Sequence, residues 1–158
     1  MGKIILDLYG GTGSWARPYS EHDGYTVHNI TLPYYNALKT RIDKGKLLFC
    51  GGTGEPIRVA PSSIYGILAA PPCTEFSSLT TSHRLPDFAE GLSHVKKCLW
   101  IIEQCASHCP KTLKFWALEN PYAKLRYFLG EPPWYLILAI LGTNGQKKRV
   151  YGAFIISQ

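Results

Sequence analysis

Three short apolar runs of this sequence each give way at once to a turn of unusual polar residues. The runs are the segments 3–9, 64–70 and 113–118, and the turns that follow them contain GGTGS, PPCTEFS and ENP. Apolar runs of this length, bounded by turn residues, are typical of buried strands in a parallel sheet. Because ligands of open α/β sheets bind beyond the carboxyl ends of the strands, we expect the three turns to face one crevice.

The segments between these runs complete an α/β pattern. A second strand is predicted at 25–32, where the residues alternate, and 33–63 is expected to form a small hairpin or excursion. Residues 87–107 give the clearest helical periodicity, and shorter helices are expected at 15–23 and 122–129. The order strand, helix, strand, excursion, strand, helix, strand, helix predicts a mostly parallel sheet with helices on both faces.

Length and composition fit one domain that spans residues 1–158. The chain is 46% hydrophobic, which is enough for one sizeable core, and its formal charge of +6 has the sign needed to meet a polyanion. No stretch approaches the roughly 20 apolar residues of a membrane helix. Residues 1–3 lead straight into a strand without a signal-peptide pattern, so we expect a cytoplasmic protein.

The five cysteines are expected to be reduced and to hold no metal. Their number is odd and their spacing is not that of a disulfide framework. His94, Cys98, Cys105 and Cys109 would share part of one helical face. At ~1.5 Å per residue the first and last of these lie about 22 Å apart, whereas zinc ligands lie about 2 Å from the metal. We therefore expect them to form a core or surface face of the helix.

The turn after the first strand has the character of a ligand-binding loop. Gly10, Gly11 and Gly13 let the backbone pass close beneath a ligand, and the start of the next helix offers free N–H groups. The turn lacks the lysine of a phosphate-binding P-loop. Asp7 is more specific, because a carboxylate at the end of a buried strand is costly unless it meets a cation or a hydrogen-bond donor. A cationic group of a ligand would serve.

The other two turns offer a nucleophile and an acid. Cys73 follows Pro71 and Pro72, which stiffen the turn and fix the direction of the thiol. A partly exposed thiol near free amides or positive charge is favoured as the reactive thiolate. Glu119 could act as an acid if burial raises its pKa. Taken singly, Cys73 can also be a packed thiol and Glu119 a capping carboxylate.

Taken together and in this order, DLYGGTG, PPCTEFS and ENP resemble the cofactor loop, the nucleophile loop and the E-N dipeptide of the cytosine-5 DNA methyltransferases. The resemblance covers about residues 4–130. Segments such as YGILAAPPCTEFS and FWALENPYAKLRYFLG look like the compact members found in bacteriophages and bacteria. The resemblance implies a Rossmann-like methyltransferase fold and transfer of a methyl group from S-adenosylmethionine to C5 of cytosine.

The resemblance also implies catalytic roles for matching residues. Cys73 would attack C6 of cytosine while Glu119 hydrogen-bonds or protonates N3, and Asn120 would position the loop. Phe76 would back the substrate site. The residues implied in substrate binding are Pro72, Phe76 and Ser77.

For the cofactor, the resemblance implies that S-adenosylmethionine lies over the glycine loop with its charged end near Asp7. Thr31 stands where the family usually has an acidic residue on the cofactor ribose. The residues implied in cofactor binding are Asp7, Tyr9, Gly11, Gly13 and Thr31.

The partner implied by the resemblance is DNA that contains cytosine. Duplex DNA would have to flip the base out of the stack, at a cost of a few kcal/mol. The length of the chain leaves no room for a separate target-recognition domain. Basic side chains available for phosphate contacts, or simply for a solvated surface, are Arg84, Lys96, Lys97, Lys124 and Arg126.

The tail, 134–158, departs from the family pattern. Read from the third base of each codon, beginning at Trp134, permitted codons encode V-F-N-P-C-D-F-G-D-K-W-T-K-K-T-C-L-W-G-F, which resembles the end of the compact members. We therefore hypothesise that the tail is a frameshifted version of that end. As it stands it reads as a hairpin, with Asn144 and Gly145 in the turn.

Three functions follow from these patterns. The first is an active or impaired cytosine-5 DNA methyltransferase. The second is an inactive relic or DNA-binding module that keeps the sheet and the basic surface. The third is a related enzyme that modifies cytosine in nucleotides or single strands.

Overall fold

The computed structural model describes residues 2–77, 85–108, 111–121, 124–130, 134–138 and 149–157. They form an α/β structure with a six-stranded sheet and a separate three-stranded antiparallel sheet. Arg84, expected to contact phosphate, Cys109, expected to share a helical face, and the predicted turn at Asn144 and Gly145 lie outside the described residues.

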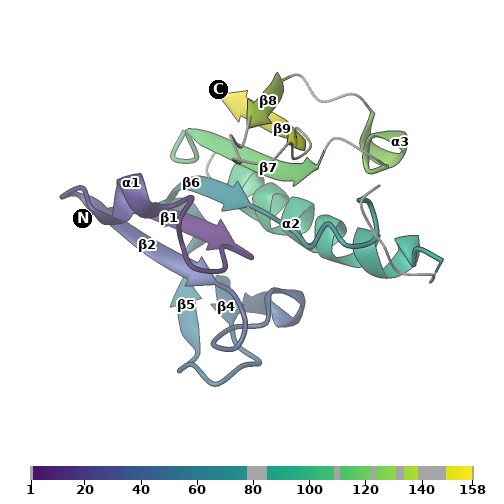
Figure 1. The fold of residues 1–158 in the computed structure, drawn as a ribbon. Coiled ribbons are helices and arrows are strands. Elements are labelled where there is room, and N and C mark those ends of the chain that lie inside the picture. The colour runs from purple at the N-terminus through teal and green to yellow at the C-terminus, as the bar shows by residue number, and fades with distance from the viewer. Residues whose placement is uncertain are drawn as a thin grey trace.

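Four neighbouring strands of the main sheet run parallel, and their arrowheads point the same way in Figure 1. The first two strands of the chain are neighbours, and the next parallel strand pairs on the other side of β1, so the strand order reverses between β1 and β6. β9 runs antiparallel to both β7 and β8. In spatial order the strands are β2 (Tyr25–Ile30), β1 (Lys3–Leu8), β6 (Ile64–Ala69), β7 (Phe115–Pro121), β9 (Arg149–Ser157) and β8 (Trp134–Leu138).

β7 begins and ends later than the apolar run 113–118 predicts. Its pairing with β9 continues from Phe115 opposite Ser157 to Pro121 opposite Tyr151. Glu119 and Asn120 therefore lie inside the strand rather than in a turn beyond it. The extension follows from a partner strand far along the chain, and the local pattern carries no signal of it.

The excursion between β2 and β6 contains the small antiparallel sheet. β3 (Arg41–Asp43), β4 (Lys46–Phe49) and β5 (Ile57–Val59) pair in that order, so the predicted hairpin is present and gains a third strand. Lys44 and Gly45, both with positive φ, form the turn between β3 and β4. Two short 3-10 helices, η1 (Ala37–Lys39) and η2 (Pro61–Ser63), flank this sheet.

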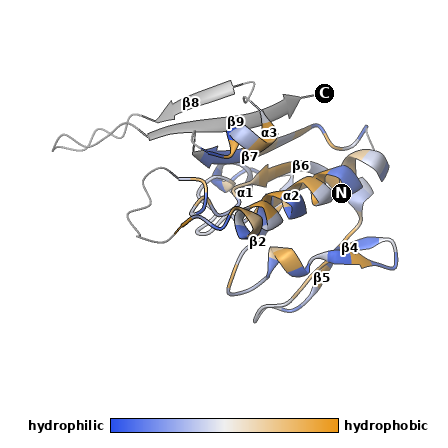
Figure 2. Cartoon of the chain, turned by 90° about the vertical axis from the view of Figure 1, so that its right-hand side faces the viewer, coloured by the Kyte–Doolittle hydropathy of each residue, from blue (hydrophilic) through white to orange (hydrophobic). Residues whose placement is uncertain are grey.

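The main core lies between one face of the large sheet, the small sheet and α2 (Phe88–His108). Alternate residues of β1 point to opposite faces, and Leu6 and Leu8 belong to this core. Leu47 and Phe49 of β4 join them, and Figure 2 shows the apolar stripe of α2. Full burial of such side chains stabilises the fold by about 1.5–3 kcal/mol each.

The second face of the sheet has a smaller apolar cluster. Ile5, Leu68 and Ala117 pack there with Ala16, which precedes the short helix α1 (Arg17–Ser20). Figure 1 shows α1 and α2 on opposite faces of the sheet, although α1 has only four residues.

The longest helix matches its prediction within one residue at each end, and the two short helices do not. α2 buries Val95, Ile101 and Ile102 together with Cys98 and Cys105, so the two thiols belong to its core face. Burial raises the pKa of each of these thiols to about 12.

The predicted helix 15–23 is reduced to Arg17–Ser20, because Pro18 restricts it to a first turn and Gly24 follows at φ 96°. Within the described part of the predicted helix 122–129, residues 124–129, the helix is α3 (Arg126–Leu129), and Gly130 ends it as expected. No helix of the described ranges is long and apolar enough to cross a membrane.

Candidate active site

Two loops leave the sheet side by side, at the point where the strand order reverses. They are the glycine loop, residues 9–14, and the loop of residues 70–77, which we call the nucleophile loop after the predicted role of Cys73. In the register of β1 and β6, Leu8 lies opposite Ala69, and the backbone N–H of Ala70 donates to the carbonyl of Leu8 at 2.9 Å. The two loops therefore start at the same level of adjacent strands, which is where ligands of doubly wound sheets bind.

The glycine loop turns sharply because several of its residues adopt positive φ. Tyr9, Gly11 and Gly13 have φ values of 60°, 55° and 76°, and the N–H of Gly13 donates to the carbonyl of Gly10 at 2.8 Å. Asn29 on β2 donates its side-chain amide to the carbonyl of Gly11 at 3.1 Å. A Cβ atom at Gly11 would meet no atom of the described residues within 4 Å, so the loop is open to them on that side.

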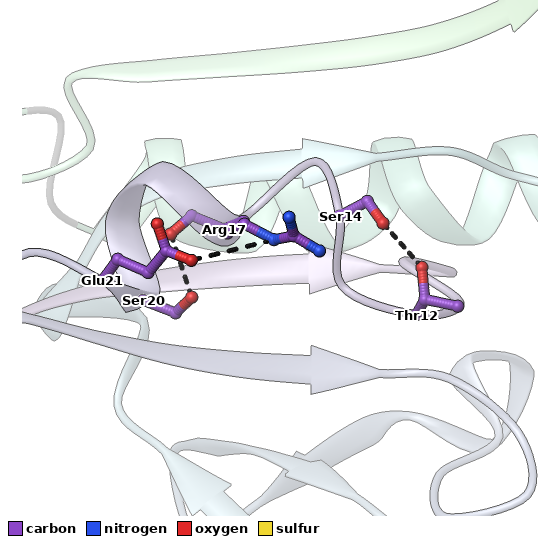
Figure 3. Close-up of polar contacts among 5 residues, drawn as sticks. All are labelled: Thr12, Ser14, Arg17, Ser20 and Glu21. Atoms are coloured by element: carbon purple, nitrogen blue, oxygen red, sulfur yellow. Dashed lines mark hydrogen bonds and ion pairs between the residues drawn. The ribbon is translucent and has the colours of Figure 1, made fainter.

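Beyond the glycines, the loop is held by short-range polar contacts (Figure 3). The hydroxyls of Thr12 and Ser14 lie 2.7 Å apart, and Ser20 donates to the carbonyl of Arg17 at 3.0 Å. The exposed ion pair between Arg17 and Glu21, at 3.8 Å, adds little stability because water screens it. The segment is thus shaped mainly by its backbone turns.

Asp7 lies beneath this loop and is fully buried. A Cβ atom on Gly10 would fall within 2.5 Å of the Asp7 carboxyl group, so a glycine is required above it. Neither carboxylate oxygen has a hydrogen-bond partner within the described part of the chain, and burial raises the pKa of Asp7 to about 6. Asp7 is thus a buried carboxyl group to which no described residue donates a hydrogen bond.

Tyr9 turns its side chain toward α2. Its hydroxyl lies 2.9 Å from Nδ1 of His94, and the two rings meet edge to face. Burial lowers the pKa of His94, while the nearby Glu90 acts in the opposite direction, and burial raises the pKa of Tyr9. The contact joins the glycine loop to the helix that covers the main core.

Cys73 sits half-buried in a tight turn after β6. Its carbonyl accepts hydrogen bonds from the N–H groups of Phe76 at 3.0 Å and Ser77 at 2.9 Å. Pro72 is exposed, whereas Pro71 is buried. The turn therefore fixes the backbone on both sides of the thiol.

Phe76 anchors this turn in the core. Its ring is fully buried and lies 6.2 Å from the ring of Phe88 and 6.1 Å from that of Phe128. A side chain on Gly91 of α2 would come within 2.9 Å of the Phe76 ring, so the helix approaches here only because it carries a glycine. The adjacent Glu75, also buried, accepts from the N–H of Asp87 at 2.6 Å.

Glu119 and Asn120 project to opposite faces of β7, as consecutive strand residues do. The Asn120 amide donates to the carbonyl of Pro71 at 3.2 Å and so ties β7 to the nucleophile loop. The side chain of Glu119 lies on the opposite face of the sheet, the same face as that of Ala117. On this face Ala117 pairs with Leu68 of β6, and Leu68 pairs with Asp7 of β1. Oε1 of Glu119 is buried without a partner in the described ranges, and burial raises the pKa of Glu119 to about 6.

Thr31 lies just past β2, at the same end of the sheet. Its carbonyl accepts from the N–H of Tyr35 at 2.9 Å, and its side chain is half-buried. Thr31 thus contributes to the local turn.

The sequence patterns missed Asn29 and Gly91, and they assigned His94 to a helical face without indicating its contact with Tyr9. Asn29 lies in an alternating strand and His94 on an amphipathic helix, so both read as ordinary members of those elements. A polar side chain in the strand beside the glycine loop was the one signal that could have drawn attention to Asn29.

Within the part of the chain that the structure describes, no three His, Cys, Asp or Glu side chains lie close enough to hold a metal ion. The sequence matches no protein-family model, and no curated protein matches it significantly.

Proposed function

We propose that this chain is a cytosine-5 DNA methyltransferase with a Rossmann-like fold, which transfers a methyl group from S-adenosylmethionine to C5 of cytosine. The observation that supports this most is the link between Asn120 and Pro71, at 3.2 Å. This hydrogen bond ties the Cys73 turn to β7, the strand that carries Glu119. The Cys73 turn follows β6, which is the neighbour of β1 and its glycine loop. A nucleophile, an acid and a ligand-binding loop then share the edge of a sheet where such folds bind ligands.

The residues around the glycine loop suit S-adenosylmethionine. The cofactor is cationic, and the carboxylate of Asp7 and Oδ1 of Asn29 are buried acceptors without a donor in the described ranges. The open side of Gly11 leaves room for a ligand against the backbone. When bound, the cofactor supplies an electrophilic methyl group on a sulfonium centre.

Cys73 and Glu119 would activate the cytosine. The Cys73 thiolate adds to C6 and forms a C–S bond, while protonated Glu119 donates to N3 and stabilises the charge that develops in the ring. This makes C5 nucleophilic enough to take a methyl group. Loss of the C5 proton to solvent and cleavage of the C–S bond then restore the aromatic ring and the thiolate.

The proposed attack on cytosine also limits the class of substrate. Neither C5 nor C6 can be approached from both faces inside a base stack, so the cytosine must be unstacked or flipped. The formal charge of +6 favours a polyanionic partner. We propose that the protein acts in the cytoplasm of a bacterial or phage-infected cell, where the thiols of Cys50, Cys73, Cys98 and Cys105 would stay reduced.

The burial of Asp7 favours a second candidate, a relic that keeps the fold and transfers nothing. Its carboxylate is covered by Gly10 and fully buried, so a cation can reach it only if the loop moves. A tail that is frameshifted from about Trp134 onward would have the same consequence, because the segment that closes the site in the family would be lost.

Trapping on DNA that contains 5-fluorocytosine tests the proposal. The fluorine takes the place of the C5 proton and, unlike that proton, cannot be lost as a cation, so the covalent adduct accumulates. With S-adenosylmethionine present, the wild type and Cys50→Ser should form a covalent complex that survives denaturation, and Cys73→Ser should form none. Cys50 is also half-buried and is the matched control. Calorimetry that detects no cofactor binding at millimolar ligand would favour the relic.

A further inference from the structure

Next to the nucleophile loop, α3 and the turn before it carry exposed aromatic side chains together with half-buried basic ones. Tyr127 is 73% exposed and Phe128 45%, which is unusual for rings of this size. Lys124 and Arg126 belong to the same short segment. We call Lys124, Arg126, Tyr127 and Phe128 the α3 patch.

One cation of this patch lies beside a ring of the patch, and the other lies beside the neighbouring ring of Phe88. The Arg126 guanidinium carbon is 5.0 Å from the centroid of the Tyr127 ring, and Nη2 of Arg126 donates to the Tyr127 hydroxyl at 3.1 Å. Nζ of Lys124 lies 5.9 Å from the ring of Phe88, which in turn lies 5.3 Å from that of Phe128. Positive charge and exposed aromatic surface are therefore interleaved.

The patch is joined directly to the turn that carries Cys73. The N–H of Lys124 donates to the carbonyl of Phe76 at 3.1 Å, and the Phe128 ring lies 6.1 Å from the Phe76 ring. Phe76 itself donates to the carbonyl of Cys73 at 3.0 Å. In Figure 1, α3 lies at the end of the sheet toward which β6 and β7 point.

We propose that the α3 patch binds single-stranded nucleic acid, with bases stacked on Tyr127 and Phe128 and phosphates beside Arg126 and Lys124. Stacking on a protein ring requires open base faces, which a single strand offers and an intact duplex does not. The phosphates complement the positive charge of the patch and of the chain. This inference deepens the proposed function, since such a strand would present its cytosines to Cys73, but the binding itself requires neither cofactor nor chemistry.

The test is fluorescence anisotropy with a short labelled oligothymidylate, which carries no cytosine. The single strand should bind more tightly than a duplex of the same length. Tyr127→Ala should weaken binding at least about fivefold, as expected for the loss of one stacked base. Tyr127→Trp should retain binding, and Tyr34→Ala should leave it unchanged, because Tyr34 is also exposed, at 59%, but lies outside the patch.

Salt dependence tests the phosphate contacts. Arg126→Gln should reduce the slope of log K against log salt concentration by about 0.7, the value for one phosphate of a single strand. Lys46→Gln, an exposed charge on β4, should leave the slope unchanged. Tighter binding of the duplex, equal effects of Tyr127→Ala and Tyr34→Ala, or competition by polyglutamate as strong as by unlabelled oligothymidylate would each overturn the inference. Thermal unfolding establishes that the variants are folded.

These outcomes are separable from those of the methylation proposal. An adduct on 5-fluorocytosine DNA without oligothymidylate binding would overturn the inference about the α3 patch alone. Oligothymidylate binding that depends on Tyr127, without any adduct, would support the patch and count against methyl transfer.

Discussion

The side-chain amide of Asn120 donates a hydrogen bond of 3.2 Å to the carbonyl of Pro71, two residues before Cys73. Asn29 makes the corresponding contact with the other loop, donating to the carbonyl of Gly11 at 3.1 Å. Each amide holds one loop against a strand that is next to the strand from which the loop emerges. The nucleophile loop and the glycine loop are thus fixed by separate contacts that can be removed one at a time.

Replacing Asn120 or Asn29 by alanine should impair the function of one loop and leave that of the other nearly unchanged. Asn120→Ala should slow adduct formation on 5-fluorocytosine DNA about tenfold or more, because the thiol loses its fixed position, and should change cofactor affinity little. Asn29→Ala should weaken S-adenosylmethionine binding and leave adduct formation at saturating cofactor nearly unchanged. Urea unfolding should show a loss of about 1–3 kcal/mol for Asn120→Ala, since the Pro71 carbonyl is left without its donor. Equal losses of both functions in both variants would contradict separate anchoring.

Gly91→Ala should destabilise the protein although alanine favours helices. The new methyl group would come within 2.9 Å of the Phe76 ring and 3.0 Å of Cβ of Glu75, and the ring is fully buried and cannot move aside freely. We expect an overpacking cost of about 1–3 kcal/mol, larger than the gain of about 1 kcal/mol in helix propensity. Urea unfolding measures the difference, with Ser93→Ala on the exposed side of α2 as control. An increase in stability for Gly91→Ala would show that Phe76 and Glu75 in the Cys73 turn can move aside to make room for the methyl group.

The features of the fold that the sequence predicts are those set by local pattern. The strands β1 and β6 end in their turns within a residue or two of expectation, and α2 follows its apolar periodicity. The apolar run predicts Asn120 in a turn beyond β7, but Asn120 lies within the strand, because the pairing with β9 depends on residues more than thirty positions away. A pattern of adjacent residues cannot contain that partner.

The same limit applies to the candidate site. Cys73 and Asp7 stand out because their neighbours in the sequence are unusual for a strand end. The contact between Tyr9 and His94 joins residues 85 positions apart, and the depth at which Gly10 covers Asp7 depends on how the loop folds back. Sequence therefore indicates which groups reach this edge of the sheet, and the packing decides which of them are exposed to a ligand.

The stability of the protein should fall as pH rises from about 4 to 6, with Asp7 responsible for a distinct part of that fall. Burial raises its pKa from 3.8 to about 6, so in this window the folded state binds the Asp7 proton more tightly than the unfolded state does. A difference of about two pH units between the two pKa values corresponds to about 3 kcal/mol in the free energy of unfolding. This contribution is lost as the pH rises from the lower pKa to the higher one, because the buried carboxyl group must then ionise in the folded state.

Asp7→Asn isolates this contribution. Urea unfolding at pH 4 and pH 7 should show a smaller decrease in stability for Asp7→Asn than for the wild type, and the contribution of Glu119, present in both proteins, cancels in the difference. If the stability of the wild type and of Asp7→Asn depends on pH in the same way, then Asp7 accepts a hydrogen bond in solution that keeps its pKa near the ordinary value. A saturating cationic cofactor should also reduce the wild-type decrease, because it favours the ionised carboxylate.

The acid role that we propose for Glu119 predicts a pH dependence of adduct formation that can be separated from that of the thiol. Burial raises the pKa of Glu119 to about 6, so its protonated fraction falls about tenfold for each pH unit above that value. The ionisation of Cys73 and the unstacking of the base affect the wild type and Glu119→Gln alike. The ratio of their adduct-formation rates on 5-fluorocytosine DNA therefore reports Glu119 alone, and it should decline above pH 6. A ratio that stays constant from pH 5 to pH 8 would show that no proton of Glu119 is used, and that its buried position on β7 serves the fold rather than the chemistry.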